Sequence, residues 1–317
     1  MKNNDISNKT VGEIFEEYSK YIEMKLKYQT VRSIKSRFKT YILPYFENTK
    51  IVDIKPKDYL KWQKMIFDKD FSFSHKKTLH YTFSELYSYL DTFYDYRNNV
   101  AKKVGALSNY EIPKEMNYWT IEEYKKFINN FSSEDWIYKF FFEFLFYTGA
   151  RLGEVNALTF SDIENDIVFI NKTISKDTIN GKRQITTPKT KTSIRKIRID
   201  SILVNEINEL KEYYNQTYSD FNESFYIFGG KSPLSPTTIT RKKDLYVKKA
   251  KVKKIRIHDF RHSHATLLLK NNIPIEEISK RLGHENLNTT LNTYIHLIPL
   301  YEKRVVNTLN SLHNKRH

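Results

Sequence analysis

The chain contains no cysteine in its 317 residues, which excludes disulfides, thiolate metal sites and thiol-based catalysis. Glycine and proline contribute only 8 residues each. This is less than half of their usual combined share of about 12%, so collagen-like and low-complexity structures are excluded. The longest apolar run, residues 140–147, is interrupted by Glu143 and is too short to cross a bilayer. The first ten residues lack the apolar segment of a secretion signal, so we expect a cytoplasmic protein.

Acidic residues are also scarce. The chain has 37 Asp and Glu against 53 Lys and Arg, a formal net charge of +16. Such an excess favours a polyanionic partner, with nucleic acid ahead of an anionic membrane surface. The alternative is that a composition rich in Lys, Asn and Ile reflects only an AT-rich genome. Hydrophobic residues make up 39% and aromatic residues 15% of the chain, enough to form folded cores, and the length suggests about two domains.

The first 104 residues show the periodicity of an all-helical domain. Thr10 and Glu13 have the spacing of a capping box at a helix start. Apolar residues then recur at helical intervals from residue 10, from residue 30, and over 58–67, 76–94 and 98–104. Residues 105–118 lose this periodicity and contain Gly105 and Pro113, which is typical of a linker.

Residues 119–317 are expected to form a second, mainly helical domain with a small antiparallel sheet. The β signals are an Ile- and Val-rich stretch at 163–174, the turn dipeptide Asn180-Gly181, and alternating segments at 185–187 and 194–199. Helical patterns precede them from residue 120 and over 135–147. Others follow at 203–214, 236–249 and 258–270, with three shorter helices at the end.

One predicted helix of the first domain carries a basic stripe. Arg32, Lys35 and Lys39 fall on one face, and no acidic residue lies between Met24 and Phe46. A solvated face usually mixes charges of both signs, so this stripe is a candidate contact to the DNA backbone. An ordinary solvated face remains the alternative.

Two segments of the second domain could present cations to a phosphate. In TGARLGE, residues 148–154, Arg151 stands between two glycines, where the backbone can turn tightly and another group can approach. The segment PKTKTSIRKIRI, residues 188–199, places Lys189 and Lys191 in the predicted hairpin. Considered singly, Arg151 could be a surface residue and the hairpin a charge-guarded sheet edge.

Two later segments hold histidines and a tyrosine. In HDFRHSHAT, residues 258–266, His258 and Arg261 are three apart and share one face of a helix. His262 and His264 do not have the spacing of a metal site, so we interpret them as packing or capping residues and expect no metal. In LGHENLNTTLNTYIH, residues 282–296, Tyr294 follows His284 by ten residues. Alone, this tyrosine would be a core or surface residue.

Together, the order of these residues resembles the tyrosine recombinases, the phage integrase family. TGARLGE is similar to the first arginine motif, a hairpin lysine follows, HDFRH and LGH are similar to the next two motifs, and a tyrosine comes soon after. The family commonly has Leu where Phe260 stands. The ten-residue gap before Tyr294 resembles integrases of Gram-positive phages and conjugative elements, and residues 10–104, with ILPYF at 42–46, resemble the core-binding domain.

The resemblance implies chemistry that uses no metal, cofactor or ATP. Tyr294 would attack the scissile phosphorus and leave a 3′-phosphotyrosyl link, while Arg151 and Arg261 bind the non-bridging oxygens. His284 would donate to the same phosphate, and His258 would act as base for Tyr294 or as a further phosphate contact. Lys189, with Lys191 as its rival, would protonate the leaving 5′ oxygen. Glu154 would orient a neighbouring catalytic side chain.

The family also implies an architecture and partners. We expect a two-domain, C-shaped clamp on double-stranded core or attachment sites, working as a homotetramer on synapsed DNA in a bacterial cell. It would integrate or excise a mobile element, with an excisionase or a host DNA-bending factor as accessory partner. The apolar stripe of the tail after Tyr294 would pack on a neighbouring protomer or, alternatively, on its own domain. Only nine residues precede the first predicted helix, so the arm-binding domain of many integrases is expected to be missing, by truncation or naturally.

Two other functions fit parts of the pattern. A type IB topoisomerase-like enzyme uses similar chemistry to relax DNA, but the helical first domain and the tail favour recombination. A catalytically silent DNA-binding regulator would not need the complete set of Arg151, Lys189, His258, Arg261, His284 and Tyr294.

Overall fold

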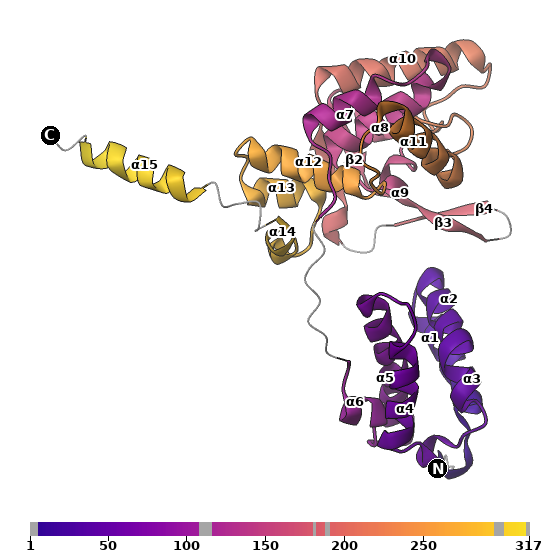
Figure 1. Ribbon diagram of the computed structural model, residues 1–317. Coiled ribbons are helices and arrows are strands. Elements are labelled where there is room, and N and C mark those ends of the chain that lie inside the picture. The colour runs from indigo at the N-terminus through magenta and orange to yellow at the C-terminus, as the bar shows by residue number, and fades with distance from the viewer. Residues whose placement is uncertain (1–5, 108–115, 180–181, 188–190, 295–300, 315–317) are drawn as a thin grey trace. The chain divides into compact units, whose positions relative to one another are not determined.

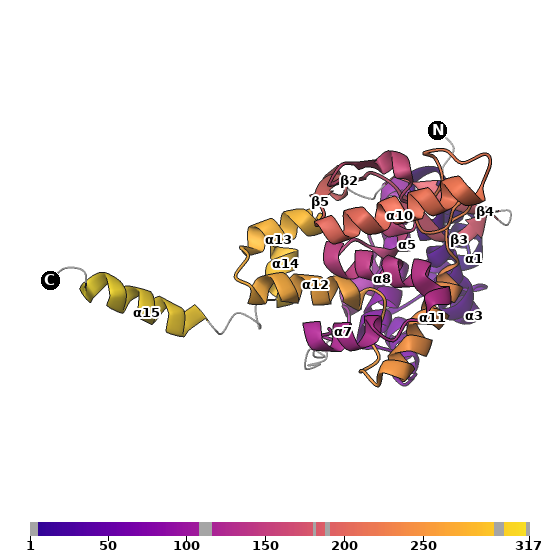
Figure 2. The same ribbon diagram turned by 90° about the horizontal axis from the view of Figure 1, so that it is seen from above.

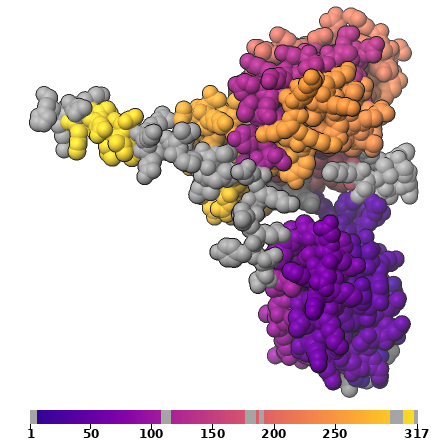
Figure 3. Space-filling view, viewed as in Figure 1, coloured from indigo at the N-terminus to yellow at the C-terminus, as the bar shows by residue number. Residues whose placement is uncertain are grey.

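The computed structural model describes residues 6–107, 116–179, 182–187, 191–294 and 301–314. The chain divides into two compact units, Met1–Lys114 and Glu115–His317, which can be followed by residue number along the colour bar of Figures 1 and 3. The boundary falls within the stretch 105–118 that the sequence suggests as a linker, although residues 108–115 lie outside the described part.

Unit 1 is built from helices alone in its described residues. The α-helices are α1 (Val11–Lys25), α2 (Tyr28–Arg37), α3 (Leu43–Phe46), α4 (Pro56–Phe67), α5 (Phe73–Tyr94) and α6 (Val100–Val104). The capping box predicted at Thr10 is present: the Glu13 N–H donates to Thr10 Oγ1 at 3.2 Å, and the Thr10 N–H donates to Glu13 Oε2 at 2.8 Å. Phe83 lies in the aromatic core, with its ring centre 5.4–5.5 Å from those of Phe46, Tyr59 and Trp62.

A π-helical turn, Phe38–Ile42, joins α2 to α3. Pro44 follows within α3 and has no N–H to donate to the preceding turn, which explains a change of hydrogen-bond register here. The Trp62 indole N–H donates to the Tyr41 carbonyl of this turn at 2.8 Å and ties it to α4.

Several helices of unit 2 pack around one central apolar helix, α8 (Trp136–Thr148). The helices are α7 (Ile121–Ile128), α8 (Trp136–Thr148), α9 (Leu152–Val155), α10 (Ser201–Thr217), α11 (Pro236–Ala250), α12 (Asp259–Lys270), α13 (Ile275–Leu282), α14 (Leu287–Tyr294) and α15 (Tyr301–Asn314). Helix α8 lies among α7, α10 and α12, as Figures 1 and 2 show from two directions. Phe260 is fully buried and stacks on Phe142 of α8 with ring centres 5.4 Å apart, so an aromatic core accommodates this departure from the family's usual Leu.

The strands form two small antiparallel sheets. One has the order β1 (Ile163–Glu164), β2 (Ile167–Ile170) and β5 (Arg195–Arg198), and the other pairs β3 (Thr173–Ile179) with β4 (Lys182–Thr186). The stretch 163–174, rich in Ile and Val, is therefore not one strand. Asn165 adopts a left-handed conformation with φ of 55° and turns the chain between β1 and β2. The predicted turn at Asn180-Gly181 lies outside the described residues.

No helix in the described ranges is both long and apolar enough to cross a membrane. Helix α15 carries the apolar residues of the predicted tail stripe that the structure describes. Val305, Val306 and Leu309 are each more than half exposed in this single chain.

Two carboxyl groups meet between α8 and α10. Glu143 and Glu206 form a side-chain hydrogen bond. Burial, this hydrogen bond and the charge of Glu143 together raise the pKa of Glu206 to about 9. One of the two groups therefore keeps its proton at neutral pH.

This pair predicts a loss of stability at alkaline pH. Between the ordinary glutamate pKa of 4.5 and the raised value near 9, the unfolded chain releases a proton that the folded chain retains, so the free energy of unfolding falls as pH rises. We expect Glu206→Gln to flatten this decline in urea unfolding measured at pH 6, 7.5 and 9. Glu209→Gln, at an exposed position of the same helix, should leave the slope unchanged. Equal slopes for all three proteins would contradict the prediction.

Candidate active site

The first predicted arginine stands directly after the central helix of unit 2. Helix α8 ends at Thr148, and Gly149 closes it in a left-handed conformation with φ of 64°. Two residues later, Arg151 precedes α9. Its backbone N–H donates to Glu154 Oε2 at 2.9 Å, and its Nη1 donates to Glu154 Oε1 at 2.8 Å. The first turn of α9 therefore fixes the arginine through one carboxylate.

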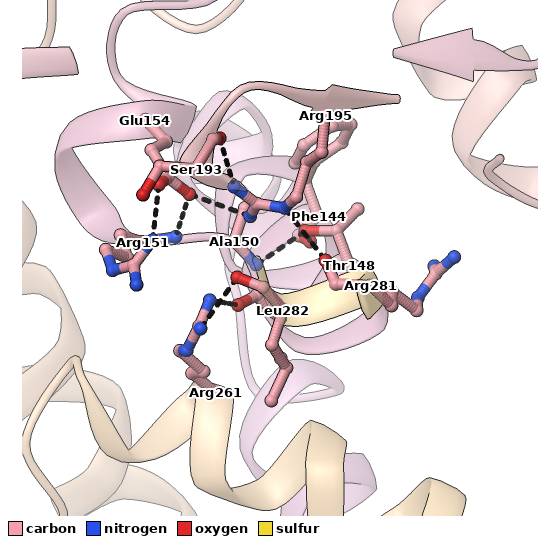
Figure 4. A network of polar contacts seen from close by, with 11 residues as sticks. Phe144, Thr148, Ala150, Arg151, Glu154, Ser193, Arg195, Arg261, Arg281 and Leu282 are labelled. Atoms are coloured by element: carbon pink, nitrogen blue, oxygen red, sulfur yellow. Dashed lines mark hydrogen bonds and ion pairs between the residues drawn. The ribbon is translucent and has the colours of Figure 1, made fainter. Parts of the chain in front are cut away.

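Glu154 also binds a second guanidinium. Arg195, at the start of β5, donates from Nη2 to Glu154 Oε2 at 2.9 Å, and from Nε to the Arg281 carbonyl at 2.8 Å. The Glu154 side chain is only 3% exposed. Burial alone would raise the pKa of Glu154, but the hydrogen bond from Arg195 and the charges of Arg195 and Arg151 hold it below its ordinary value. Figure 4 shows this carboxylate between the two arginines.

Arg261 is held by backbone carbonyls. Its Nη1 donates to the Gly149 carbonyl at 3.0 Å and its Nη2 to the Leu282 carbonyl at 2.7 Å (Figure 4). The residue is 3% exposed. Burial and the charges of Arg151 and Arg195 lower the pKa of Arg261 to about 9, which still leaves it charged at neutral pH. The cluster thus concentrates positive charge where an anion would relieve the repulsion.

The two histidines assigned by resemblance lie near these arginines. Burial, followed by the charges of Arg261 and Arg151, lowers the pKa of His258. The same causes, with a contribution from Arg195, lower the pKa of His284 to about 4. His284 Nδ1 is hydrogen-bonded to Thr290 Oγ1 at 2.6 Å. Both imidazoles are therefore neutral at pH 7, and a neutral ring can donate one N–H to a phosphate oxygen.

Tyr294 ends α14 and is buried, with 2% of its surface exposed. It packs in a small apolar cluster with Ala265, Leu269, Ile278 and Leu282. Burial raises the pKa of Tyr294, while the charge of Arg261 opposes that rise. The structure thus brings Tyr294 into the electrostatic neighbourhood of Arg261, together with Arg151, Glu154, His258 and His284.

The contacts of three residues could not be recognised in the sequence. The sequence suggests that Glu154 orients a neighbouring side chain, but no local pattern marks Arg195, 41 positions further on, as its partner. His264 packs in the core as expected, yet it also bonds the Phe146 carbonyl at 2.9 Å and accepts from Arg281 Nε at 3.1 Å. His262, interpreted as a packing or capping residue, places Nδ1 2.9 Å from the Tyr294 hydroxyl.

The other candidate residues lie in unit 1, in a short turn of unit 2, or outside the residues that the structure describes. Lys189 falls in residues 188–190, beyond the described part of the chain, and Lys191 begins a short 3₁₀ turn. Arg32, Lys35 and Lys39 belong to unit 1. Lys35 forms an ion pair with Glu23 of α1 at 2.6 Å. Glu23 lies just before the stretch from Met24 to Phe46 that contains no acidic residue, and it neutralises part of the charge of the basic stripe.

No group of three or more His, Cys, Asp or Glu residues in the described ranges could hold a metal ion. What the site does bring together is cationic and imidazole side chains around one carboxylate. Such donors suit a phosphate that gains negative charge on its oxygens during reaction.

Comparison with known families identifies both units. The model of the phage integrase family matches residues 117–299, and that of the phage integrase N-terminal SAM-like domain matches residues 10–67. A curated relative, the ICEBs1 integrase of Bacillus subtilis, is 34% identical over 204 residues, which cover 63% of this chain and 55% of the relative. The chain thus matches about half the length of that relative.

Solved structures share the fold. The Tn1549 transposon integrase in complex with transposon right end DNA has a TM-score of 0.74 at 18% identity, covering 90% of this chain and 95% of that one. A lambda integrase tetramer bound to a Holliday junction has a TM-score of 0.67 at 19% identity, covering 90% and 80%.

The close packing around Gly149 predicts that adding one methyl group at this position destabilises the protein. A Cβ at Gly149 would lie 2.5 Å from His264 Cδ2 and 2.9 Å from Leu282 Cδ2. Gly149→Ala should therefore lose about 1–2 kcal/mol to left-handed backbone strain and a further ~1–3 kcal/mol to overpacking, measured by urea unfolding.

Gly230→Ala is the matched control. Gly230 has nearly the same φ, 65°, but its added Cβ would find no atom closer than 3.6 Å. It should lose only the strain contribution. If the two variants were equally destabilised, the close packing of His264 against the turn would not limit this position.

Proposed function

Because the chain belongs to the phage integrase family, we propose that it is a site-specific DNA recombinase that integrates or excises a mobile element. It cleaves and rejoins strands through a 3′-phosphotyrosyl intermediate. The observation that carries the proposal is the gathering, in unit 2, of Arg151, His258 and His284 around Arg261, whose charge also acts on Tyr294.

Each side chain has a role in this proposal. The Tyr294 oxygen attacks the scissile phosphorus, and Arg151 and Arg261 bind the non-bridging oxygens as negative charge builds on them. His284 donates to the same phosphate. Its bond with Thr290 engages Nδ1, which leaves Nε2 for the substrate. Glu154 holds Arg151 in place, and Lys189, or Lys191 in its stead, protonates the leaving 5′ oxygen.

The reaction conserves its energy and needs no metal. The phosphotyrosyl ester keeps the energy of the broken phosphodiester, so the 5′-hydroxyl of a second strand can reverse the step without ATP. Guanidinium and imidazole groups supply the charge stabilisation that divalent cations supply in many other nucleases. The pairing of Arg151 and Arg195 with one buried carboxylate supports this assignment, because it concentrates cations beside Arg261.

The substrate in this proposal is a double-stranded attachment site, and the active form is a homotetramer. The related structures in complex with DNA and the lambda tetramer support both points by similarity of fold. Within this chain, the exposed apolar side chains of α15 offer a surface for a second copy. Arg32, Lys35 and Lys39 would contact the DNA backbone, and an excisionase or a DNA-bending protein would set the direction of the reaction.

The proposal predicts a covalent protein–DNA adduct that depends on one oxygen atom. Wild-type protein incubated with a nicked duplex of the DNA flanking its gene should form a species stable in SDS, because the cleaved fragment diffuses away and the link cannot reverse. Tyr294→Phe should bind this duplex normally and form no adduct, since it lacks only the attacking oxygen.

Tyr301→Phe is the control and should form the adduct at the wild-type level. Adducts that persist in Tyr294→Phe would assign the nucleophile elsewhere. No adduct from the wild-type protein, despite tight binding, would favour a DNA-binding regulator over a recombinase.

A further inference from the structure

The hydroxyl of Tyr294 is hydrogen-bonded to a side chain to which the family resemblance assigns no catalytic role. We propose that His262 is the catalytic base that accepts the Tyr294 proton, and that His258 contacts the phosphate instead. This inference rests on the proposed function, in which Tyr294 is the nucleophile. It decides between the two roles that the sequence leaves open for His258.

The hydrogen bond between His262 Nδ1 and the Tyr294 hydroxyl spans 2.9 Å, within the reach required of a general base. The two ring centres lie 5.9 Å apart at an interplanar angle of 60°. His262 is on α12, four residues after His258, and Tyr294 is at the end of α14. The base and the nucleophile thus come from two different helices of unit 2.

His258 has different surroundings. Its ring meets His262 edge to face, with centres 5.2 Å apart. After burial, the strongest influences that lower its pKa are the charges of Arg261 and Arg151, the two groups proposed to bind the phosphate. The charges of the proposed phosphate-binding arginines thus act strongly on His258, whereas His262 is the residue that is hydrogen-bonded to Tyr294.

The charge state of His262 suits a proton acceptor. Burial and the neighbouring His258 lower the pKa of His262 to about 4, so the ring is neutral at pH 7 and can accept at one nitrogen. Helix α12 and the elements packed against it bring six titratable or charged groups near this ring: His258, Asp259, Arg256, Arg261, Tyr294 and His284. Asp259 raises the pKa of His262, while His258, Arg256 and Arg261 lower it. A bound phosphate would offset part of the cationic influence and make the imidazole a stronger base.

The step balances without any further reactant. The Tyr294 oxygen forms a bond to phosphorus while its proton moves to His262 Nδ1. The bond from phosphorus to the 5′ oxygen breaks, and that oxygen takes a proton from the general acid, Lys189 or Lys191. In the rejoining step the 5′-hydroxyl attacks the phosphotyrosyl link and gives its proton back to the now neutral lysine, while His262 returns its proton to the departing tyrosine oxygen.

The competing explanation is that the hydrogen bond only holds the buried Tyr294 in position. Two substitutions separate these roles. His262→Asn keeps a polar atom near the place of Nδ1 and can preserve the hydrogen bond, but an amide cannot take up a proton at neutral pH. His262→Ala removes both functions.

The experiment is single-turnover cleavage of the nicked duplex, with excess protein, between pH 6 and 9. At pH 7 both His262→Asn and His262→Ala should cleave about 10²–10⁴-fold more slowly than wild type, with DNA affinity unchanged. Hydroxide should replace the missing base as pH rises, so the deficit should shrink by about tenfold per pH unit. His258→Ala should also be slow, but its deficit should stay constant with pH.

A second substrate distinguishes a role of His262 as base from a role as general acid. When sulfur replaces the bridging 5′ oxygen, the leaving group needs little protonation, but Tyr294 must still lose its proton. Both His262 variants should therefore remain slow on this DNA.

Several results would overturn the assignment. Wild-type rates for His262→Asn would show that a hydrogen bond suffices, and faster cleavage by His262→Ala would show that His262 restrains Tyr294. A loss of cleavage rate in the His262 variants that does not change with pH would also contradict a role as base. So would a loss that disappears on the sulfur-substituted DNA. Failure of the wild-type protein to form any adduct would instead remove the proposed function itself.

Discussion

The buried carboxylate of Glu154 is the contact on which the geometry of the site depends. It is shared by Arg151 and Arg195 at 2.8 and 2.9 Å, and it joins the loop after α8 to the start of β5. A buried carboxylate without partners would be costly, and so would two adjacent guanidiniums without a counter-charge. Together they form a stable unit that still carries excess positive charge. Arg261, bound only through backbone carbonyls in the described contacts, adds to that excess.

A second set of contacts, made by His264 and Arg281, fixes the position of this cluster. His264 bonds the end of α8 through the Phe146 carbonyl and accepts from Arg281, whose other nitrogens donate to the carbonyls of Arg198 and Tyr147. These contacts join α8, α12, α13 and β5. Gly149 allows His264 to approach closely enough for Arg261 to reach the turn. The candidate site residues that the structure describes thus stand on helices or within a few residues of them rather than on long loops.

The order of motifs assigns Arg151, His258, Arg261, His284 and Tyr294 as candidate site residues, because each stands in a local pattern that can be read along the chain. The structure places all five in unit 2, and their roles stay a prediction. Capping and helical periodicity likewise predicted most helices, as at Thr10. Contacts between distant segments could not be read in this way. The pairing of Arg195 with Glu154 and the approach of His262 to Tyr294 depend on packing around α8 and α12. The division of residues 163–174 into separate strands depends on a left-handed Asn165, which composition alone does not reveal.

The most direct test of the central claim is to identify the atom that carries the DNA. The adduct would be digested with nuclease and protease, and the nucleotide-bearing peptide sequenced by mass spectrometry. The account predicts a nucleotide joined through its 3′ phosphate to the hydroxyl of Tyr294. A nucleotide attached to any other side chain, or joined through a 5′ phosphate, would contradict it.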